Sequence, residues 1–160
     1  MPYSLAIFDL DGTLADSFPW FKRHVNDVAD RFKFRRVAED DIEMLRHSGS
    51  REILAHLEVS RWKLPRIARY MRRLKAEQIA EIALFEGAET MLRALAESGL
   101  RLALISSDSE ANARRLLGET APLFSHFDCA ASIFGKAAKF RRALRRTGIS
   151  AARTIAIGDE

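Results

Sequence analysis

The chain has 160 residues, of which 26 are lysine or arginine and 22 are aspartate or glutamate, so its formal net charge is +4, and 48% of its residues are hydrophobic. This length and composition favour one globular domain, or one domain with a sizeable insertion, and exclude a disordered chain. No apolar run approaches the roughly 18–20 residues that span a membrane. Since the first residues do not resemble a signal peptide and Cys129 is the single cysteine, we expect a cytoplasmic protein.

Short apolar runs alternate with amphipathic helices along much of the chain. Each run is too short for a helix and stops at a turn or a polar residue, which predicts a buried strand. We expect strands at Leu5–Leu10, Leu100–Ile105, Phe127–Phe134 (the least regular) and Thr154–Ile157, and helices at Glu89–Ser98 and Lys139–Thr147, each closed by a glycine. This alternation predicts an α/β fold with a parallel sheet.

Residues 16–84 interrupt the alternation. Their apolar residues recur at helical spacing, with no strand pattern between them, as in Phe21, Val25 and Val28 or Leu64, Ile67 and Met71. We therefore predict an inserted helical module between the first strand and the rest of the α/β core. This module holds 15 basic and 11 acidic residues, so it carries all of the excess positive charge.

Two carboxylates, Asp9 and Asp11, stand at the end of the first predicted strand and are followed by Gly12. Side chains at positions i and i+2 of an extended segment point the same way, so both can face one site. Two close carboxylates repel each other unless a divalent metal or a shared proton intervenes. Ser106 and Asp159 come just after the ends of two further predicted strands. Ligands of parallel sheets bind at these carboxyl ends.

These residues carry a resemblance to the haloacid dehalogenase (HAD) superfamily. The run from Asp9 to Leu14 matches its first motif, Asp-x-Asp-Gly-Thr-Leu, and the apolar run ending at Ser106 resembles its second. Gly158-Asp159-Glu160 resembles the opening of the fourth motif. The third motif is a lysine, for which Lys136 has the better spacing and Lys139, one helical turn later, is the alternative.

The resemblance implies a role for each matching residue. Asp9 would be the nucleophile that forms an aspartyl-phosphate, and Asp11 the general acid and base. Mg²⁺ would be held by Asp9, by the backbone carbonyl of Asp11 and by Asp159. The phosphate would be bound by the residues around the first and second motifs, with Lys136 balancing its charge: Gly12, Thr13, Ser106 and Ser107.

The family also implies the architecture. We expect a Rossmann-like, three-layer α/β core of residues 1–15 and 85–160, and an all-α cap of residues 16–84, as in the phosphoglycolate phosphatase-like branch. Caps of this kind close over the active site and select the substrate. Arg51, at a glycine-containing break between two cap helices, is a hypothetical partner for an anionic leaving group.

Asp11 favours phosphate-ester chemistry, because the dehalogenases of the family resemble the first motif without this second aspartate. The predicted function is a Mg²⁺-dependent phosphatase for a small phosphorylated metabolite, similar to phosphoglycolate or a sugar phosphate. A phosphomutase of the same branch is an alternative. A third possibility is a non-catalytic protein that binds a partner through the basic cap.

The basic run from Arg61 to Lys75 holds seven cations and no acid, which by charge alone would suit a nucleic acid. Its apolar residues form the stripe of a single helix, so we favour a solvated face and expect neither a nucleic-acid nor a membrane partner. Cys129 fits a small buried hydrophobic residue. Either Asp108 or Ser109 is expected to cap the helix that follows.

The end of the sequence yields a further expectation. The fourth motif of the family continues to another acid, and its core usually has a fifth strand and a final helix. We therefore expect a shortened form of a longer protein, without the C-terminal part of the core. Thr154–Ile157 would then be an open strand edge.

Overall fold

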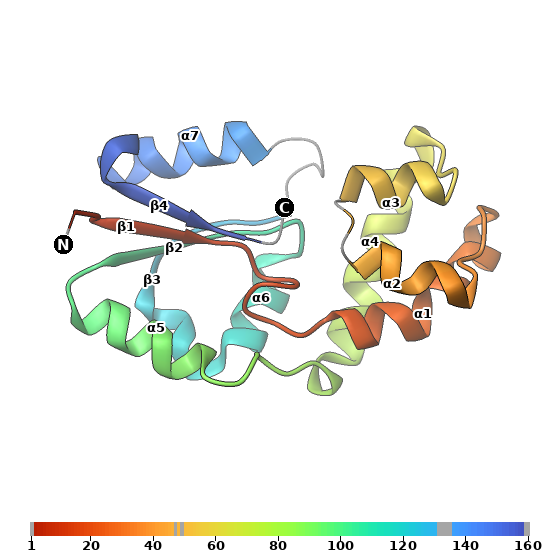
Figure 1. Ribbon diagram of the computed structural model, residues 1–160, viewed down its shortest axis with the longest axis horizontal. Coiled ribbons are helices and arrows are strands. Elements are labelled where there is room, and N and C mark those ends of the chain that lie inside the picture. Colours follow the sequence, from red (N-terminus) through yellow and green to blue (C-terminus); the bar gives the residue numbers. More distant parts are fainter. Residues whose placement is uncertain (1, 47, 49, 131–135, 159–160) are drawn as a thin grey trace. The chain divides into compact units, whose positions relative to one another are not determined.

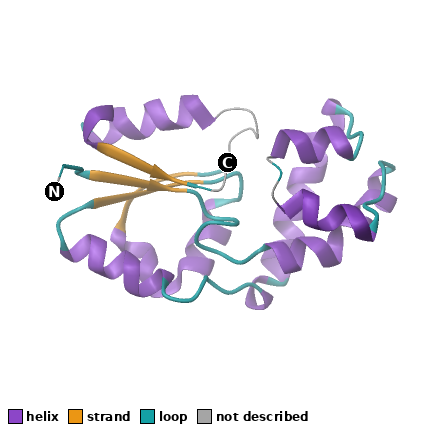
Figure 2. Ribbon diagram, in the orientation of Figure 1, coloured by secondary structure: helices purple, strands orange, loops and turns teal. Residues whose placement is uncertain are grey.

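A computed structural model of the chain describes residues 2–46, 48, 50–130 and 136–158. Along the chain, four strands alternate with helices, and short 3-10 turns connect several of them (Figures 1 and 2). The strands are β1 (Leu5–Phe8), β2 (Arg101–Ile105), β3 (Phe124–Asp128) and β4 (Thr154–Ile157). The helices are α1 (Phe18–Phe32), α2 (Ile42–Arg46), α3 (Ser50–His56), α4 (Leu64–Glu77), α5 (Ala88–Glu97), α6 (Glu110–Leu117) and α7 (Lys136–Thr147).

The four strands form one parallel sheet in the order β3-β2-β1-β4. All four residues of β1 are buried, because β1 lies inside the sheet and both of its faces are covered. Helix α7 lies on one face, and α5 and α6 lie on the other (Figure 1). The predicted three-layer α/β core with a parallel sheet is therefore confirmed, and β4 is an edge strand of the described sheet.

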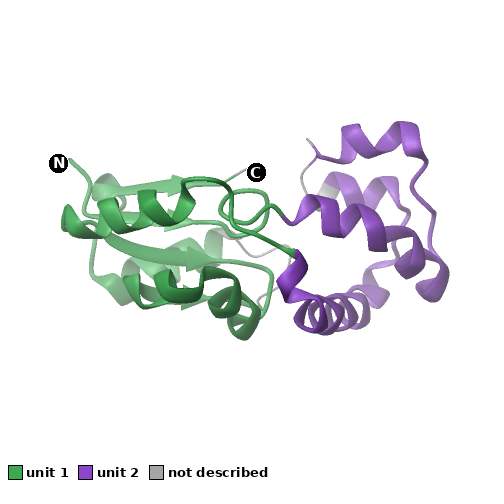
Figure 3. Ribbon diagram, turned by 90° about the horizontal axis from the view of Figure 1, so that it is seen from below, with its two compact units in different colours: residues 1–16, 82–159 green, residues 17–81, 160 purple. Residues whose placement is uncertain are grey.

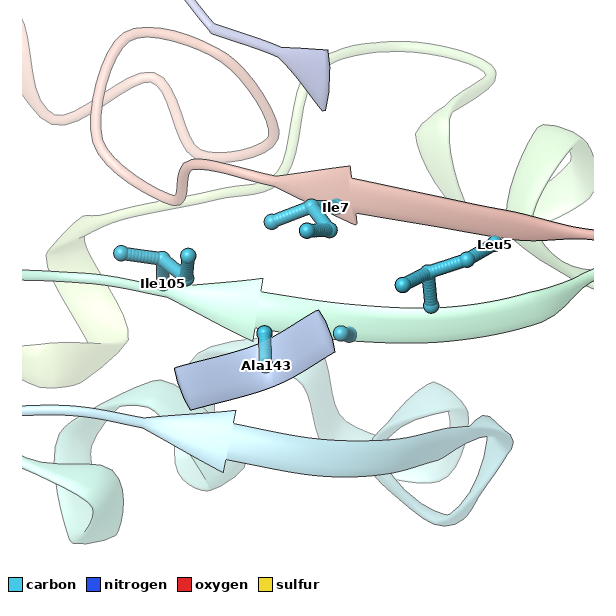
Figure 4. Close-up of a cluster of buried hydrophobic side chains, with 5 residues drawn as sticks. Leu5, Ile7, Ile105 and Ala143 are labelled. Carbon is cyan, nitrogen blue, oxygen red and sulfur yellow. The ribbon is translucent and has the colours of Figure 1, made fainter. Parts of the chain in front are cut away.

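One hydrophobic cluster joins α7 to the sheet. Leu5 and Ile7 of β1, Ala103 and Ile105 of β2 and Ala143 of α7 are buried together (Figure 4). Ala6 and Phe8, which alternate with Leu5 and Ile7 along β1, point to the opposite face of the sheet, as the two-residue period of a strand requires. Leu92 of α5 and Leu117 of α6 are fully buried as well.

Three of the predicted elements have a boundary that is wrong by two residues or more. The first strand ends at Phe8 rather than Leu10, because the Leu10 carbonyl closes a turn instead of pairing with a neighbouring strand. The third strand is Phe124–Asp128 rather than Phe127–Phe134, and residues 131–135 lie outside the described residues. β3 is an edge strand that exposes Ser125, so it lacks the continuous apolar run expected of a strand buried on both faces.

The third wrong boundary concerns α7, which begins at Lys136, three residues before the predicted start. Ala137 and Ala138 are exposed in its first turn. They favour a helix by intrinsic propensity, but they do not contribute to its apolar stripe, which was the basis of the prediction.

The chain divides into two compact units, residues 1–16 with 82–159 and residues 17–81 (Figure 3). The second unit is helical and has its own hydrophobic cluster, built from Val25, Val37, Leu45 and Leu57. The Lys63 ammonium, just before α4, donates to the carbonyls of Phe32 and Lys33 at the end of α1, both at 2.9 Å. A cation there satisfies carbonyls that the helix leaves unpaired, so this member of the basic run has a structural role.

The two segments that connect the units pair with each other. The Asp16 N–H donates to the Ala83 carbonyl at 2.9 Å, and the Phe85 N–H donates to the Leu14 carbonyl at 2.9 Å. The chain thus leaves the α/β unit and returns to it through one antiparallel pair of extended segments.

In the part of the chain that the structure describes, each helix is too short or too polar to cross a membrane.

The central position of β2 makes its side chains the best test of the core. We expect Leu104→Ala, at a fully buried position, to lower the free energy of unfolding by about 2–5 kcal/mol, because it removes apolar contacts and leaves a cavity. Met91→Ala on α5, where the side chain is 39% exposed, is the matched control and should cost about 0.5 kcal/mol or less. Urea denaturation measures both values, and equal losses would contradict this description of the core.

Candidate active site

The first motif folds into a tight turn directly after β1. The Leu10 carbonyl accepts hydrogen bonds from the N–H groups of Thr13, Leu14 and Ala15, at 3.3, 2.9 and 2.8 Å. Gly12 has a φ of 77°, in the left-handed region that residues with a side chain rarely adopt. The turn therefore needs a glycine at this position. Asp11 lies within this turn, two residues after Asp9.

The register of the sheet brings three strand ends to within one residue of each other. Phe8 pairs with Leu104 of β2 on one side and with Ile157 of β4 on the other. Asp9 and Gly158, which follow directly, are therefore neighbours at one edge of the sheet. Ser106 reaches the same edge one residue later, after Ile105 ends β2. The Asp9 N–H donates to the Ile157 carbonyl at 3.0 Å, and a methyl group at Gly158 would lie 3.5 Å from the Asp9 Cβ atom.

Lys139 of α7 also reaches this edge of the sheet. Its side chain is 2% exposed, and its ammonium donates to the backbone carbonyl of Ser106 at 3.0 Å. A buried ammonium requires polar or anionic partners, because burial removes its hydration. Of the two lysines considered for the third motif, Lys139 is the one whose side chain is described, and it lies at Ser106.

For three of the predicted site residues, the structure describes no side chain. Asp159 lies outside the described residues, and the side chains of Lys136, which begins α7, and of Arg51 in α3 are likewise outside the described part of the chain. Ser107 is described and is exposed, directly after the buried Ser106. The structure thus brings Asp9, Ser106 and Lys139 to one edge of the sheet but provides no side-chain position for Lys136, Arg51 or Asp159.

The loop after β2 and the start of α6 each contain one functional candidate that the sequence did not single out as such. Asp108 and Asn112 are 4% and 2% exposed, and the Asn112 side-chain amide donates to the Asp108 carboxylate at 2.8 Å. Ser109 is the residue that caps α6, because its hydroxyl oxygen accepts the Asn112 N–H at 3.1 Å. The four-residue spacing from Asp108 to Asn112, which places both on one side of the helix start, is the signal that could have found the pair.

The donors at this edge of the sheet suit a hard cation. Asp9 supplies a carboxylate oxygen and Asp11 a backbone carbonyl oxygen, the kind of hard ligand that Mg²⁺ prefers, and Gly158 brings the chain beside Asp9 immediately before Asp159. The Thr13 hydroxyl oxygen is buried and has no hydrogen-bond partner among the described residues. Among those residues, His, Cys, Asp and Glu side chains form no group of three. A complete oxygen shell therefore requires Asp159 or ligands from outside the chain.

Two titratable groups near the end of β3 have shifted pKa values. Burial, reinforced by the nearby carboxylates of Glu110, Asp108 and Asp128, raises the pKa of the Cys129 thiol to about 12, although Lys139 opposes the shift. Burial also lowers the pKa of His126, against the attraction of Asp128. Asp128 itself is nearly buried and pairs with Arg142 of α7 at 3.1 Å. Cys129 is thus held as a neutral thiol.

Comparison with known proteins agrees with this geometry. The family model described as haloacid dehalogenase-like hydrolase matches residues 6–160. A phosphoglycolate phosphatase from Synechococcus elongatus is 30% identical over 156 residues, which cover 96% of this chain and 74% of that protein.

Solved structures share the fold. A Lactobacillus plantarum protein provisionally named a phosphoglycolate phosphatase superposes with a TM-score of 0.82 at 16% identity, over 98% of this chain and 77% of that chain. CbbY from Rhodobacter sphaeroides, solved in complex with phosphate, has a TM-score of 0.71 at 22% identity, over 96% of this chain and 76% of that one.

The chain belongs to the haloacid dehalogenase-like hydrolase family. Within it, the chain is similar to the phosphoglycolate phosphatase-like proteins. The resemblance predicted from the motifs is confirmed.

The state of Cys129 can be tested with a thiol reagent. A pKa of about 12, against an ordinary value of 9.0, lowers the thiolate population near neutral pH by roughly 1000-fold, and the thiolate is the reactive form. We therefore expect iodoacetamide to alkylate Cys129 at pH 8 at least about 100-fold more slowly in the folded protein than in urea. Mass spectrometry over time measures both rates. Equal rates would show that the thiol is neither buried nor suppressed as described.

Proposed function

We propose that this protein is a Mg²⁺-dependent phosphatase that hydrolyses a small phosphorylated metabolite similar to phosphoglycolate or a sugar phosphate. The observation that carries the proposal is the buried Lys139 ammonium bound to the Ser106 carbonyl, at the same carboxyl edge of the sheet as Asp9. A fixed positive charge and a carboxylate at one edge of the sheet suit a site that receives an anion and attacks it. The match to a phosphoglycolate phosphatase supports the same choice.

In the proposed reaction, a carboxylate oxygen of Asp9 attacks phosphorus and the bond from phosphorus to the ester oxygen breaks. Asp11 gives a proton to the departing alcohol, which leaves an aspartyl-phosphate on Asp9. Asp11, now ionised, accepts a proton from water as the water attacks phosphorus. Inorganic phosphate departs and the Asp9 carboxylate is restored, so the two steps together hydrolyse one ester bond.

The other residues hold the phosphoryl group. Lys139 offsets the negative charge that Asp9 and the phosphate bring together, and the Ser106 hydroxyl donates to a phosphoryl oxygen. The buried Thr13 hydroxyl is an additional donor. Gly12 shapes the turn that carries it, since the Gly12 N–H donates to the Ala15 carbonyl at 2.9 Å, and Ser107 follows Ser106 at the same edge of the sheet. Asp9, Asp11 and Asp159 would hold Mg²⁺, which when bound supplies charge neutralisation for the phosphoryl group.

We also propose that the chain consists of a catalytic core and a cap. Residues 1–15 and 85–160 form the catalytic core, and residues 16–84 form the cap that selects the substrate. The paired segments at Asp16–Ala83 and Leu14–Phe85 supply the connection through which such a cap is attached. Lys63 is engaged at the end of α1, and Arg73 is paired with Glu77, which supports a structural role for at least part of the basic run.

The two aspartates are the first test. We expect Asp9→Asn to lower kcat by about 10³-fold or more, because an amide is a poor nucleophile. Asp11→Asn should lower kcat/KM by roughly 10²–10⁴-fold for alkyl phosphates. Its effect on p-nitrophenyl phosphate should be smaller, because p-nitrophenolate leaves without a proton. Phosphate release with Mg²⁺ present measures each value.

Asp16→Asn is a matched control, since Asp16 lies after the motif turn and pairs through its backbone; its activity should stay within about threefold of wild type. The proposal is lost if the wild type releases no phosphate from a broad panel of esters with Mg²⁺. It is also lost if Asp9→Asn retains wild-type activity.

The choice between the two lysines has its own experiment. We expect Lys139→Met to lower kcat by about 10²-fold or more, because it removes the charge that faces the phosphate, while Lys136→Met changes kcat by about threefold or less. Methionine fills the buried space of the aliphatic stem, so thermal unfolding can confirm that Lys139→Met is folded. A larger loss in Lys136→Met would assign the role to Lys136 instead, and equal losses in both variants would contradict a specific role for Lys139.

A further inference from the structure

Asp108, two residues after Ser106, is the centre of a group of buried polar contacts. One oxygen of the Asp108 carboxylate, Oδ1, accepts two hydrogen bonds, from the Ser109 N–H at 2.6 Å and from the Asn112 side-chain amide at 2.8 Å. Asn112 is buried in the first turns of α6. The carboxylate therefore ties the loop after β2 to a rigid helix rather than leaving it to solvent.

The main chain of Asp108 is fixed on both sides. Its N–H donates to the Ser106 hydroxyl oxygen at 3.1 Å, and its carbonyl accepts the Ala130 N–H at 2.6 Å. On the neighbouring strand end, the Ser106 N–H donates to the Asp128 carbonyl at 3.1 Å. The loops after β2 and β3 thus hold each other through two backbone hydrogen bonds.

These contacts decide the direction of the Ser106 hydroxyl. Its oxygen already accepts from the Asp108 N–H, so its own proton must point elsewhere. The Ser106 carbonyl is occupied by Lys139, and in the described part of the chain no acceptor takes the hydroxyl proton. That proton is the donor that the proposed function requires for a phosphoryl oxygen.

We propose that Asp108, held by Asn112, is a positioning residue that directs the Ser106 hydroxyl proton toward the transferring phosphoryl group. This inference rests on the proposed function and adds to it a pair of residues that need not touch the substrate. A carboxylate is the strongest acceptor available for two N–H donors. Its charge also lies at the start of α6, where the helix dipole favours an anion, so a buried negative charge can be kept close to an anion site.

Positioning is tested through the energetic coupling between Asp108 and Ser106. We expect Asp108→Ala and Asn112→Ala each to lower kcat for p-nitrophenyl phosphate by roughly 10–100-fold, with KM changed by about threefold or less. In a Ser106→Ala background, Asp108→Ala should add about threefold or less, since the residue acts through the missing hydroxyl. Full additivity of the two losses would overturn the inference.

The reciprocal exchange is the rescue experiment. In the double variant D108N/N112D, the amide and the carboxylate trade places and the hydrogen bond between them can re-form. We expect kcat to return to within about threefold of wild type, although each single change lowers it. A double variant as impaired as the worse single variant would contradict a role for this hydrogen bond. The exchange also keeps the test valid if Asp108→Ala does not fold.

Ser109→Ala is the matched structural control, because it removes the α6 cap but leaves the backbone N–H that binds Asp108. Its melting temperature should fall by a few degrees while kcat stays within about threefold. If kcat falls as much in Ser109→Ala as in Asp108→Ala, Asp108 and Asn112 only stabilise the fold and do not position Ser106.

The affinity for inorganic phosphate, which is measured without catalysis, separates this inference from the proposed function. Titration calorimetry with inorganic phosphate should show binding to the wild type that is weakened roughly tenfold in Asp108→Ala and unchanged in Ser109→Ala. If the wild type hydrolyses no ester, the proposed function fails and this binding difference alone decides the role of Asp108. Equal affinities, or no phosphate binding by the wild type, would overturn the inference.

Discussion

The pairing of β1 with both of its neighbours is the constraint on which the rest of the molecule depends. Phe8 is level with Leu104 and with Ile157, so a slip of one residue on either side would move Asp9 away from Ser106 or from Gly158. Such a slip would also turn the apolar residues of β1 to the wrong faces. The burial of Leu5 and Ile7 against Ala143 of α7 therefore fixes the register, and the register brings the candidate catalytic residues together.

The same helix supplies both the packing and the charge. α7 buries Ala143 against the sheet and, one turn closer to its start, places the Lys139 ammonium at the Ser106 carbonyl. The hydrophobic contacts hold the ammonium in a site from which water is excluded, where an electrostatic interaction is stronger than at the surface. A substitution that loosens the packing of α7 is thus expected to affect the site as well as the stability.

Much of the fold could be predicted from the sequence, because its strands are short apolar runs closed by turns and its helices have clear stripes. β1, β2 and β4 were located on this basis. β3 was misplaced, because Ser125 and His126 on an edge strand interrupt the apolar pattern. The Asp9-to-Leu14 motif identified the family, yet spacing alone favoured Lys136 over Lys139. The three-dimensional path of α7 shows that Lys139 is buried at Ser106, whereas the side chain of Lys136 lies outside the described part of the chain. Asp108 and Asn112 were missed as a pair, since each residue is ordinary near a helix start and only burial makes the contact informative.

The paired segments at Asp16–Ala83 and Leu14–Phe85 also have a consequence for how the protein can vary. To the α/β unit, everything between them is one long loop whose two ends are already hydrogen-bonded to each other. The entropy of closing such a loop rises slowly with its length, by about 0.6 kcal/mol for each doubling. Inserts of very different size can therefore be exchanged at this point with little cost to the stability of the sheet. This junction is a natural place to graft a different recognition module onto the same core.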